Sequence, residues 1–448
     1  MANTVSLPYD PSTIKRELAP FYISASEQEL EQMYQEIGAS SDQDLYAHIP
    51  SQLLFSTPPA LTANLGYQDL ANHLADIASM NRPKPGFIGD GLINARVHEI
   101  APFVASLRGL TTAYTPYQPE RSQGTLWTLW VYSSMISKLT GFEAINASFY
   151  DRSTCMYEAC NTAIRLKRGS NTILIVDGIY PGDKSVLQTQ AEETNLNLEF
   201  VPLKNGEADL EALKEKIELY GDKLAALVFP QTNHFGNLEN VDLLTDLAGE
   251  HKLSAIAVID PMLLATGGLK APSTFGSNQQ GCDMIVGEGQ HLAIAPNFGG
   301  PGLGLFGIRF NDQKKNDIRS TAGRFVGKTV DEEGNECLAM VLSTREQHIR
   351  REKATSNICS NQSFVATMAG ASLLARGENG TAQQVKFTRD SFTQLTSELL
   401  SREGISLAFP ASSNFNQITL DFGQPAKEVI TAASKAGLHL GVAVSERG

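Results

Sequence analysis

Thr172-Ile-Leu-Ile-Val176, Leu224-Ala-Ala-Leu-Val-Phe229 and Ala255-Ile-Ala-Val-Ile259 are the stretches that decide the fold of this chain. Each is a short, continuous apolar run, which is typical of a strand buried on both faces of a sheet. Amphipathic segments that suit helices separate the runs, and parallel strands need crossover connections of that kind. The alternation therefore predicts right-handed βαβ units and a mostly parallel sheet.

The same rhythm of strand and helix continues on both sides of these runs. Residues 302–307, Gly-Leu-Gly-Leu-Phe-Gly, formally match a dinucleotide-binding glycine motif. That motif needs a helix after it, whereas this one lies inside an apolar run, so we interpret it as a buried strand. Further strands are expected at 198–201, 283–286 and 303–310, and helices at 126–139, 153–167, 183–194, 209–219, 239–251 and 356–403.

The chain is expected to have three parts. Residues 1–85 form an N-terminal helical arm without a core pattern of its own, and the prolines of Arg82-Pro-Lys-Pro-Gly86 end it. Residues 86–325 carry the alternation of strands and helices and form a large α/β domain. Residues 326–448 hold a strand pair, a helical stretch and a β-α-β tail with its last strand at 438–444, which predicts a small C-terminal α/β domain.

The composition argues against several classes of function. The 448 residues include 36 Lys and Arg against 49 Asp and Glu, a net charge of −13. Because phosphates repel an acidic chain, we expect no nucleic-acid partner and no membrane surface. The first residues lack an apolar signal segment, no apolar run is long enough to span a membrane, and the five Cys show neither disulfide nor zinc spacing. A cytoplasmic protein without a metal site is therefore expected.

A parallel sheet of this size suits an enzyme that uses pyridoxal phosphate (PLP), which needs three devices. An Asp at a strand end pairs with the pyridine nitrogen, and Asp260 follows a predicted strand. A helix N-terminus binds the phosphate, and Ser153 and Thr154 begin a predicted helix. A Lys forms the Schiff base, but residues 271–312 contain none, and Lys270 precedes the next strand. The third device is missing.

Four motifs carry a resemblance to a known family. They are Tyr114-Thr-Pro-Tyr-Gln-Pro-Glu-Arg-Ser-Gln-Gly124, Val286-Gly-Glu-Gly-Gln290, Phe298-Gly-Gly-Pro301 and the long polar run Thr344-Arg-Glu-Gln-His-Ile-Arg-Arg-Glu-Lys-Ala-Thr-Ser-Asn357. On these motifs, residues 25–445 resemble the glycine cleavage system P-protein, glycine dehydrogenase (decarboxylating), and in particular subunit 1 (alpha) of its two-chain form.

The resemblance implies a fold-type I PLP-dependent transferase architecture and an enzymatic role. In this family glycine is decarboxylated on PLP, and its aminomethyl group passes to a lipoyl carrier protein. The resemblance further implies that subunit 2 (beta) carries the Schiff-base Lys and binds PLP covalently, while subunit 1 lacks that Lys. His291 stands where the Lys would be, and an imidazole cannot form an imine with the cofactor aldehyde.

The sequence departs from the family pattern at two positions of the expected pocket. Arg152 is large and cationic where the subunit has a small helix start, which changes the shape of the pocket. His234 is an imidazole where the family tends to have an aromatic side chain. The vestigial cofactor pocket is expected to contain Asp260, Ser153, Thr154, His291 and His234.

Two further segments are candidates for contacts with partners. A loop stiffened by Pro116 and Pro119 belongs, by the resemblance, near the active site at the subunit contact; the alternative is a structural loop. A cationic patch at 345–353 suits an anion or the acidic lipoyl carrier; the alternative is ion pairing within one helix. The loop candidates are Tyr114, Tyr117, Gln118, Glu120 and Gln123, and the patch consists of Arg345, His348, Arg350, Arg351 and Lys353.

The sequence leaves two other functions open. One is a pseudo-enzyme that acts as a binding or regulatory protein outside the complex. Both the absence of the Schiff-base Lys and the presence of Arg152 in the expected pocket allow this function. The other is an active PLP enzyme that uses Lys270 or a distant Lys. His291 also suits a buried core residue, and Asp260 also suits a capping carboxylate before a proline.

Overall fold

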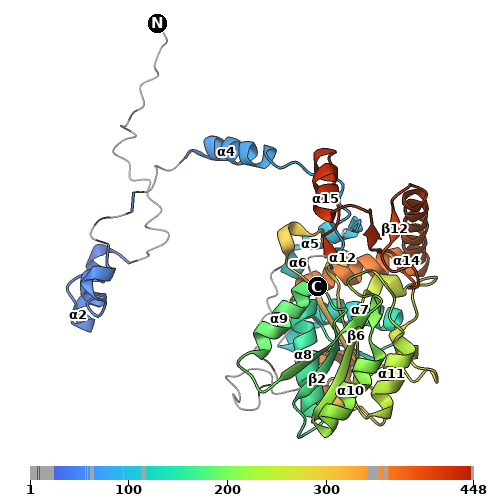
Figure 1. Ribbon diagram of the computed structural model, residues 1–448. Helices are drawn as coiled ribbons and strands as arrows, with labels where there is room; N and C mark the ends of the chain where they lie inside the picture. Colours follow the sequence, from blue (N-terminus) through green and yellow to red (C-terminus); the bar gives the residue numbers. More distant parts are fainter. Residues whose placement is uncertain are drawn as a thin grey trace. The chain divides into compact units, whose positions relative to one another are not determined.

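The computed structural model describes residues 8, 10, 25–55, 57, 59–60, 65–93, 95–111, 118–341, 354, 356 and 362–444. The chain divides into two compact units, Met1–Pro83 and Lys84–Gly448. The second unit contains the sheet and every residue of the candidate site discussed below (Figure 1).

The described residues of the first unit form short helices in which no side chain is buried. Helix α2 begins with a capping box, in which Ser26 and Glu29 each bond the other's backbone N–H, at 3.3 and 2.7 Å. It ends at Gly38, whose φ of 73° suits a glycine. The helices are α2 (Glu27–Ile37), α3 (Asp42–Leu45), η2 (Ser51–Leu53) and α4 (Tyr67–Ser79).

A seven-stranded sheet forms the centre of the second unit, in the strand order β1-β9-β8-β7-β6-β2-β3. Five adjacent strands, β8, β7, β6, β2 and β3, run parallel to one another. At the other end of the sheet, β9 pairs antiparallel with β8, and β1 pairs antiparallel with β9. The predicted mostly parallel α/β fold is confirmed, and the glycines at 302–307 lead into a strand as expected. The strands are β1 (Ala144–Ile145), β2 (Thr172–Val176), β3 (Asn197–Val201), β6 (Leu224–Pro230), β7 (Ser254–Ile259), β8 (Met284–Glu288) and β9 (Gly304–Ile308).

Helices cover both faces of this sheet (Figure 1). Alternate residues of a strand point to opposite faces, so in β2 the side chains of Ile173 and Ile175 pack on one layer of helices and those of Leu174 and Val176 on the other. One layer consists of α8 (Arg152–Leu166) and α9 (Pro181–Ala191), and the other of α7 (Gln123–Thr140), α10 (Leu210–Tyr220), α11 (Val241–Glu250) and the first turns of α14 (Ser363–Leu400).

Smaller elements flank the sheet. The prediction of a strand at 438–444 is wrong. Only His439 pairs there, in an isolated bridge with Gly86, and the glycines at 437 and 441 disfavour a longer strand. The domain boundary expected at 326 stays a prediction. The small elements are β4 (Leu203–Lys204), β5 (Glu207–Ala208), β10 (Val326–Val330), β11 (Glu336–Met340), β12 (Ser406–Leu407), β13 (Leu420–Asp421), α5 (Ile100–Ala105), α6 (Arg108–Thr111), α12 (Gln290–Ala293), α15 (Ala426–Lys435), η3 (Pro119–Arg121), η4 (Gly221–Lys223), η5 (Pro261–Leu264), η6 (Pro272–Thr274), η7 (Asn297–Gly299) and η8 (Asp317–Ser320).

Candidate functional site

The carboxyl ends of parallel strands β7 and β8 meet at one edge of the sheet, which is where open α/β proteins bind ligands. A cavity of about 40 Å³ lies there. Asp260 after β7, Glu288 at the end of β8, Arg152 at the start of α8, Tyr180 before α9 and Gln417 from the C-terminal segment all line it. This edge is therefore the candidate site.

Asp260 and His291 lie against each other at this edge. One carboxylate oxygen of Asp260, Oδ1, accepts a hydrogen bond of 3.0 Å from the backbone N–H of Met262. The same oxygen lies 3.1 Å from Nε2 of His291, whose side chain is only 2% exposed. The two atoms lie within ion-pair distance, but within the described part of the chain neither ring nitrogen of His291 makes a hydrogen bond. The close approach leaves no room for a pyridine ring between the two side chains.

The N-terminus of α8 is already occupied by carboxylates. Asp151 caps the helix by accepting the N–H of Thr154 at 2.8 Å. Glu288 accepts the N–H of Arg152 at 3.2 Å. The hydroxyl of Ser153 donates to Oδ1 of Asp183 at 3.0 Å and points away from an incoming anion. A phosphate placed on this helix end would therefore meet the negative charge of Asp151 and Glu288, which already bond two of its N–H groups.

Arg152 fills the space beside these carboxylates. Its Nε donates to Oδ2 of Asp183 at 2.6 Å, and its guanidinium carbon lies 4.6 Å from the centre of the Tyr180 ring. The Arg152 and Asp183 side chains are 12% and 8% exposed. Burial is the largest single influence on the pKa of Arg152 and lowers it, but the charge and hydrogen bond of Asp183, with the charges of Tyr180 and Glu288, together outweigh burial and raise the pKa. Arg152 is therefore a permanent cation inside the candidate pocket.

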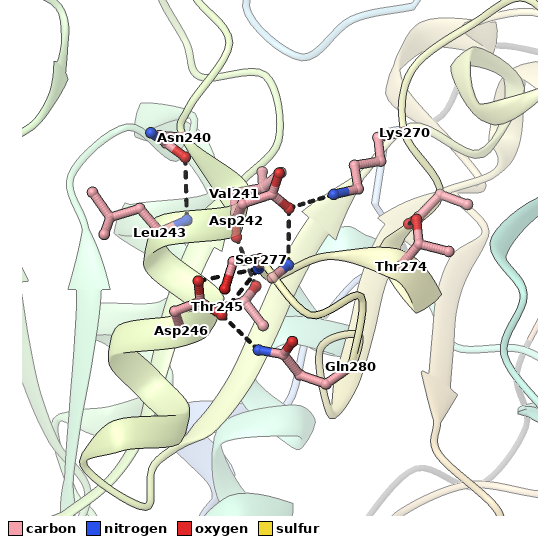
Figure 2. Close-up of polar contacts among 12 residues, drawn as sticks. Asn240, Val241, Asp242, Leu243, Thr245, Asp246, Lys270, Thr274, Ser277 and Gln280 are labelled. Atoms are coloured by element: carbon pink, nitrogen blue, oxygen red, sulfur yellow. Dashed lines mark hydrogen bonds and ion pairs between the residues drawn. The ribbon is translucent and has the colours of Figure 1, made fainter.

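His234, an expected pocket residue, and Lys270, the alternative Schiff-base lysine, both lie outside the cavity. His234 follows β6, bonds Gly178 through its backbone N–H at 2.8 Å, and stacks its ring 4.0 Å from that of Phe235; it does not line the cavity. Lys270 donates to Oδ1 of Asp242 on helix α11 at 2.6 Å, as Figure 2 shows. Its ammonium is thus directed to the flank of the sheet and not to Asp260.

The loop that contains Pro116 and Pro119 is only partly within the described residues. Tyr114, Tyr117 and all five residues of the cationic patch, Arg345 to Lys353, lie outside the described residues. Gln118 and Glu120 are exposed around η3. Gln123 clamps the hairpin strand β11, since its Nε2 donates to the Leu338 carbonyl at 2.8 Å and its Oε1 accepts the Leu338 N–H at 2.9 Å.

Sequence reasoning did not single out Asp183, Tyr180 or Glu288. Glu288 lies in the motif Val286-Gly-Glu-Gly-Gln290, and its position at the end of a predicted strand was a usable signal. No such signal exists for Asp183, because its partner Arg152 precedes it by 31 residues and the pair forms only after folding.

The residues present do not fit PLP. The cavity of about 40 Å³ is far smaller than a ligand pocket, which has on the order of 300–1,000 Å³. The lining residues in the described part of the chain include no Lys, and two N–H groups of the first turn of α8, those of Arg152 and Thr154, already bond carboxylates. Within the same residues no group of three or more His, Cys, Asp or Glu is placed to hold a metal ion. No helix among them is long and apolar enough to cross a membrane.

This arrangement of sheet and helices is the fold of the fold-type I PLP-dependent enzymes. It is shared with a cysteine desulfurase from Thermococcus onnurineus NA1 (TM-score 0.55, 14% identity, 85% of this chain and 88% of that one). An alanine–glyoxylate aminotransferase from a Nostoc species shares it too (TM-score 0.52, 14% identity, 86% and 90% covered).

Closer similarity identifies the family. The crystal structure of a glycine decarboxylase (P-protein) in inhibitor-bound form matches with a TM-score of 0.79 and 32% identity over 93% of this chain and 90% of that one. A probable glycine dehydrogenase (decarboxylating) subunit 1 from Legionella pneumophila (strain Corby) is 34% identical over 426 residues, 94% of this chain and 91% of the relative. The family model for the glycine cleavage system P-protein matches residues 20–447. The chain belongs to this family.

Proposed function

We propose that this chain is subunit 1 of a two-chain glycine dehydrogenase (decarboxylating) and is active only with a Lys-bearing second subunit. The observation that carries the proposal is the similarity along residues 20–447, with relatives named as subunit 1 that align over nearly their whole length. The pseudo-enzyme alternative has no comparable support.

The partner subunit then holds PLP covalently, and the bound cofactor supplies the electron sink for the loss of CO2 from glycine. The lining of the cavity supports this division, because among the described residues it includes no Lys whose amine could form the imine. This chain would contribute the loop 114–123 to the partner's active site and the patch 345–353 to the docking of the lipoyl carrier. A reducing compartment such as the cytoplasm fits the free thiols of Cys155, Cys160, Cys282 and Cys337.

Reconstitution tests the proposal. Purified alone, the chain should not exchange the carboxyl group of glycine with labelled bicarbonate, and adding the second subunit should start the exchange. The two chains should also copurify from the native host. Exchange by this chain alone, or failure of the second subunit to bind it, would contradict the proposal.

The loop has its own test in the reconstituted complex. Tyr117→Phe with Glu120→Gln should lower the exchange rate by about 10-fold or more if these groups orient substrate. The matched control is Tyr220→Phe with Glu218→Gln on α10, which should leave the rate unchanged. An unchanged rate for the loop variant would remove the loop from the site.

The patch is tested by charge reversal. Arg350→Glu with Arg351→Glu should raise the KM for the lipoyl carrier, most strongly at low salt, and leave the KM for glycine unchanged. Lys214→Glu with Lys223→Glu, on α10 and η4, is the matched control with the same change of charge. Equal KM values for the carrier in both variants would argue against docking at the patch.

A further inference from the structure

The guanidinium of Arg152 occupies a built position with contacts on several sides. The Tyr180 ring covers it at 4.6 Å, and Asp183 accepts its Nε at 2.6 Å. The backbone at Gly91 also lies close, because a Cβ added there would come 2.6 Å from Nη2. Gly91 has a φ of 80°, so a glycine suits this position both for its backbone and for the space. The planar guanidinium of Arg152 thus covers the face of the Tyr180 ring on which the planar ring of a cofactor would otherwise stack.

The carboxylate of Glu288 is held like a bound anion. It accepts N–H groups from three separate segments: Arg152 at the start of α8 at 3.2 Å, Gln290 after β8 at 2.9 Å, and Leu303 before β9 at 2.7 Å. Backbone N–H groups that converge near a helix N-terminus are a favourable site for an anion such as phosphate. Here the anion is supplied by the chain itself.

We propose that this chain fills its own vestigial cofactor pocket. The guanidinium of Arg152 takes the place of a flat ring on Tyr180, the carboxylate of Glu288 takes the place of a phosphate at α8, and His291 takes the place of a pyridine nitrogen against Asp260. We call Arg152, Glu288 and His291 the internal plug. The plug closes the pocket without any ligand, so that the chain binds neither PLP nor phosphate there even noncovalently.

The internal plug also joins the sheet edge to the C-terminal segment. The Tyr180 hydroxyl, under the Arg152 guanidinium, accepts a hydrogen bond of 3.3 Å from Nε2 of Gln417. Gln417 also packs on Gly236, where a Cβ would come 2.5 Å from its carbonyl. Arg152 therefore lies on the ring of the residue that contacts Gln417. The proposal stands on geometry and does not require a partner subunit.

Ligand binding to the wild-type chain is the first test. The probes are inorganic phosphate and 4-deoxypyridoxine 5′-phosphate, which lacks the aldehyde and cannot react with surface lysines. Neither should change the thermal unfolding midpoint of the full-length chain beyond the effect of sodium chloride at equal ionic strength. A saturable rise in the midpoint with either probe would overturn the proposal.

Chemical rescue of Arg152→Gly is the second test. The variant leaves Asp183 buried without its partner, so the midpoint should fall by about 5 °C. Millimolar methylguanidinium should restore part of the loss, because it can reoccupy the space over Tyr180. Arg309→Gly is the matched control: this arginine pairs with Glu143 at 2.9 Å and lies 5.4 Å from the Phe142 ring, outside the pocket. Its variant should show no comparable rescue.

Arg152→Lys keeps the test decisive if the glycine variant fails to fold. Lysine retains the charge but loses the flat stack and the Nε–H, so a smaller fall of the midpoint is expected. A wild-type midpoint in Arg152→Lys, or equal rescue of the Arg152 and Arg309 variants, would show that the guanidinium has no special place in the pocket. Reconstituted glycine exchange is a separate measurement, so failure of the internal plug and failure of the proposed function can be told apart.

Discussion

Lys270 donates its ammonium to Oδ1 of Asp242 at 2.6 Å, and the same oxygen accepts the backbone N–H of Gly276 at 2.8 Å (Figure 2). Asp242 lies on helix α11 and Lys270 in the segment before η6, and their side chains are 42% and 38% exposed. The ion pair holds the first lysine after Asp260 along the chain at the flank of the sheet.

Replacing Lys270 should therefore have little consequence. Lys270→Met should change the free energy of unfolding by less than about 1 kcal/mol, because an exposed ion pair is worth little. It should leave glycine exchange by the reconstituted complex unchanged. Borohydride reduction with PLP, followed by peptide mapping, should not label Lys270 above other surface lysines. Selective labelling of Lys270, or loss of exchange in the variant, would restore the active-enzyme alternative.

Gln123 should matter through the backbone of β11. Gln123→Leu removes both bonds to Leu338 and should cost about 1–3 kcal/mol, because a partly buried backbone N–H loses its partner. Hydrogen exchange at the Leu338 amide should speed up with it. Gln118→Leu is the control, since Gln118 is exposed beside the same turn. Equal protection of Leu338 in both variants would contradict the clamp.

Glu239 should make stability depend on pH. Burial raises its pKa from 4.5 to about 7, although it accepts hydrogen bonds from the Ala208 N–H at 2.9 Å and from Asn233 Nδ2 at 2.7 Å. Between these two pH values the folded chain holds a proton that the unfolded chain has released. Its stabilising contribution is thus fully present below pH 4.5 and is lost as the pH rises through 7, by about 3 kcal/mol at most.

The measurement is the free energy of unfolding across pH 5 to 8. Glu239→Gln cannot titrate, so its curve should be flatter than that of the wild type in this range. Asp246→Asn is the control, because hydrogen bonds lower the pKa of the exposed Asp246 and its contribution changes only at more acidic pH. Parallel curves for wild type and Glu239→Gln would rule out this titration.

Gly141 should tolerate no side chain at the end of α7. Its φ is 72°, and an added Cβ would collide with the side chain of Ser273. Gly141→Ala should destabilise the chain by about 1–2 kcal/mol, and Ser273→Gly in the same chain should recover only the part due to the collision. Gly124→Ala inside α7, where a Cβ meets open space, should instead be neutral or stabilising by about 0.5–1 kcal/mol. Denaturant unfolding of these variants checks the contrast.

The sheet was predictable from sequence because its strands are buried on both faces and read as uninterrupted apolar runs. Strand β2 matches its predicted bounds, Thr172–Val176, for that reason. The strand predicted at 438–444 does not form. An apolar run indicates that a segment can be buried, but it does not show whether a neighbouring strand is available for pairing.

The pocket was less predictable than the sheet. The positions of Asp260 and of the α8 helix start follow from strand ends and helix starts, which have local signals. The contacts that decide the chemistry do not: Arg152 finds Asp183, and His291 reaches Asp260, only through the crossover geometry of the folded sheet. The missing Lys and the unusual side chains of Arg152 and His291 were visible in the sequence, but the contacts that these side chains make were not.

The two apolar layers on either side of the sheet contain none of the pocket's charged side chains; Arg152, Asp260 and Glu288 all lie beyond them, at the strand ends. The residues that stabilise the fold are thus largely different from the charged residues at the rim of the sheet, where the strands end. Substitutions at the rim can therefore change the chemistry of the pocket without disturbing the packing that holds the sheet and its helices together.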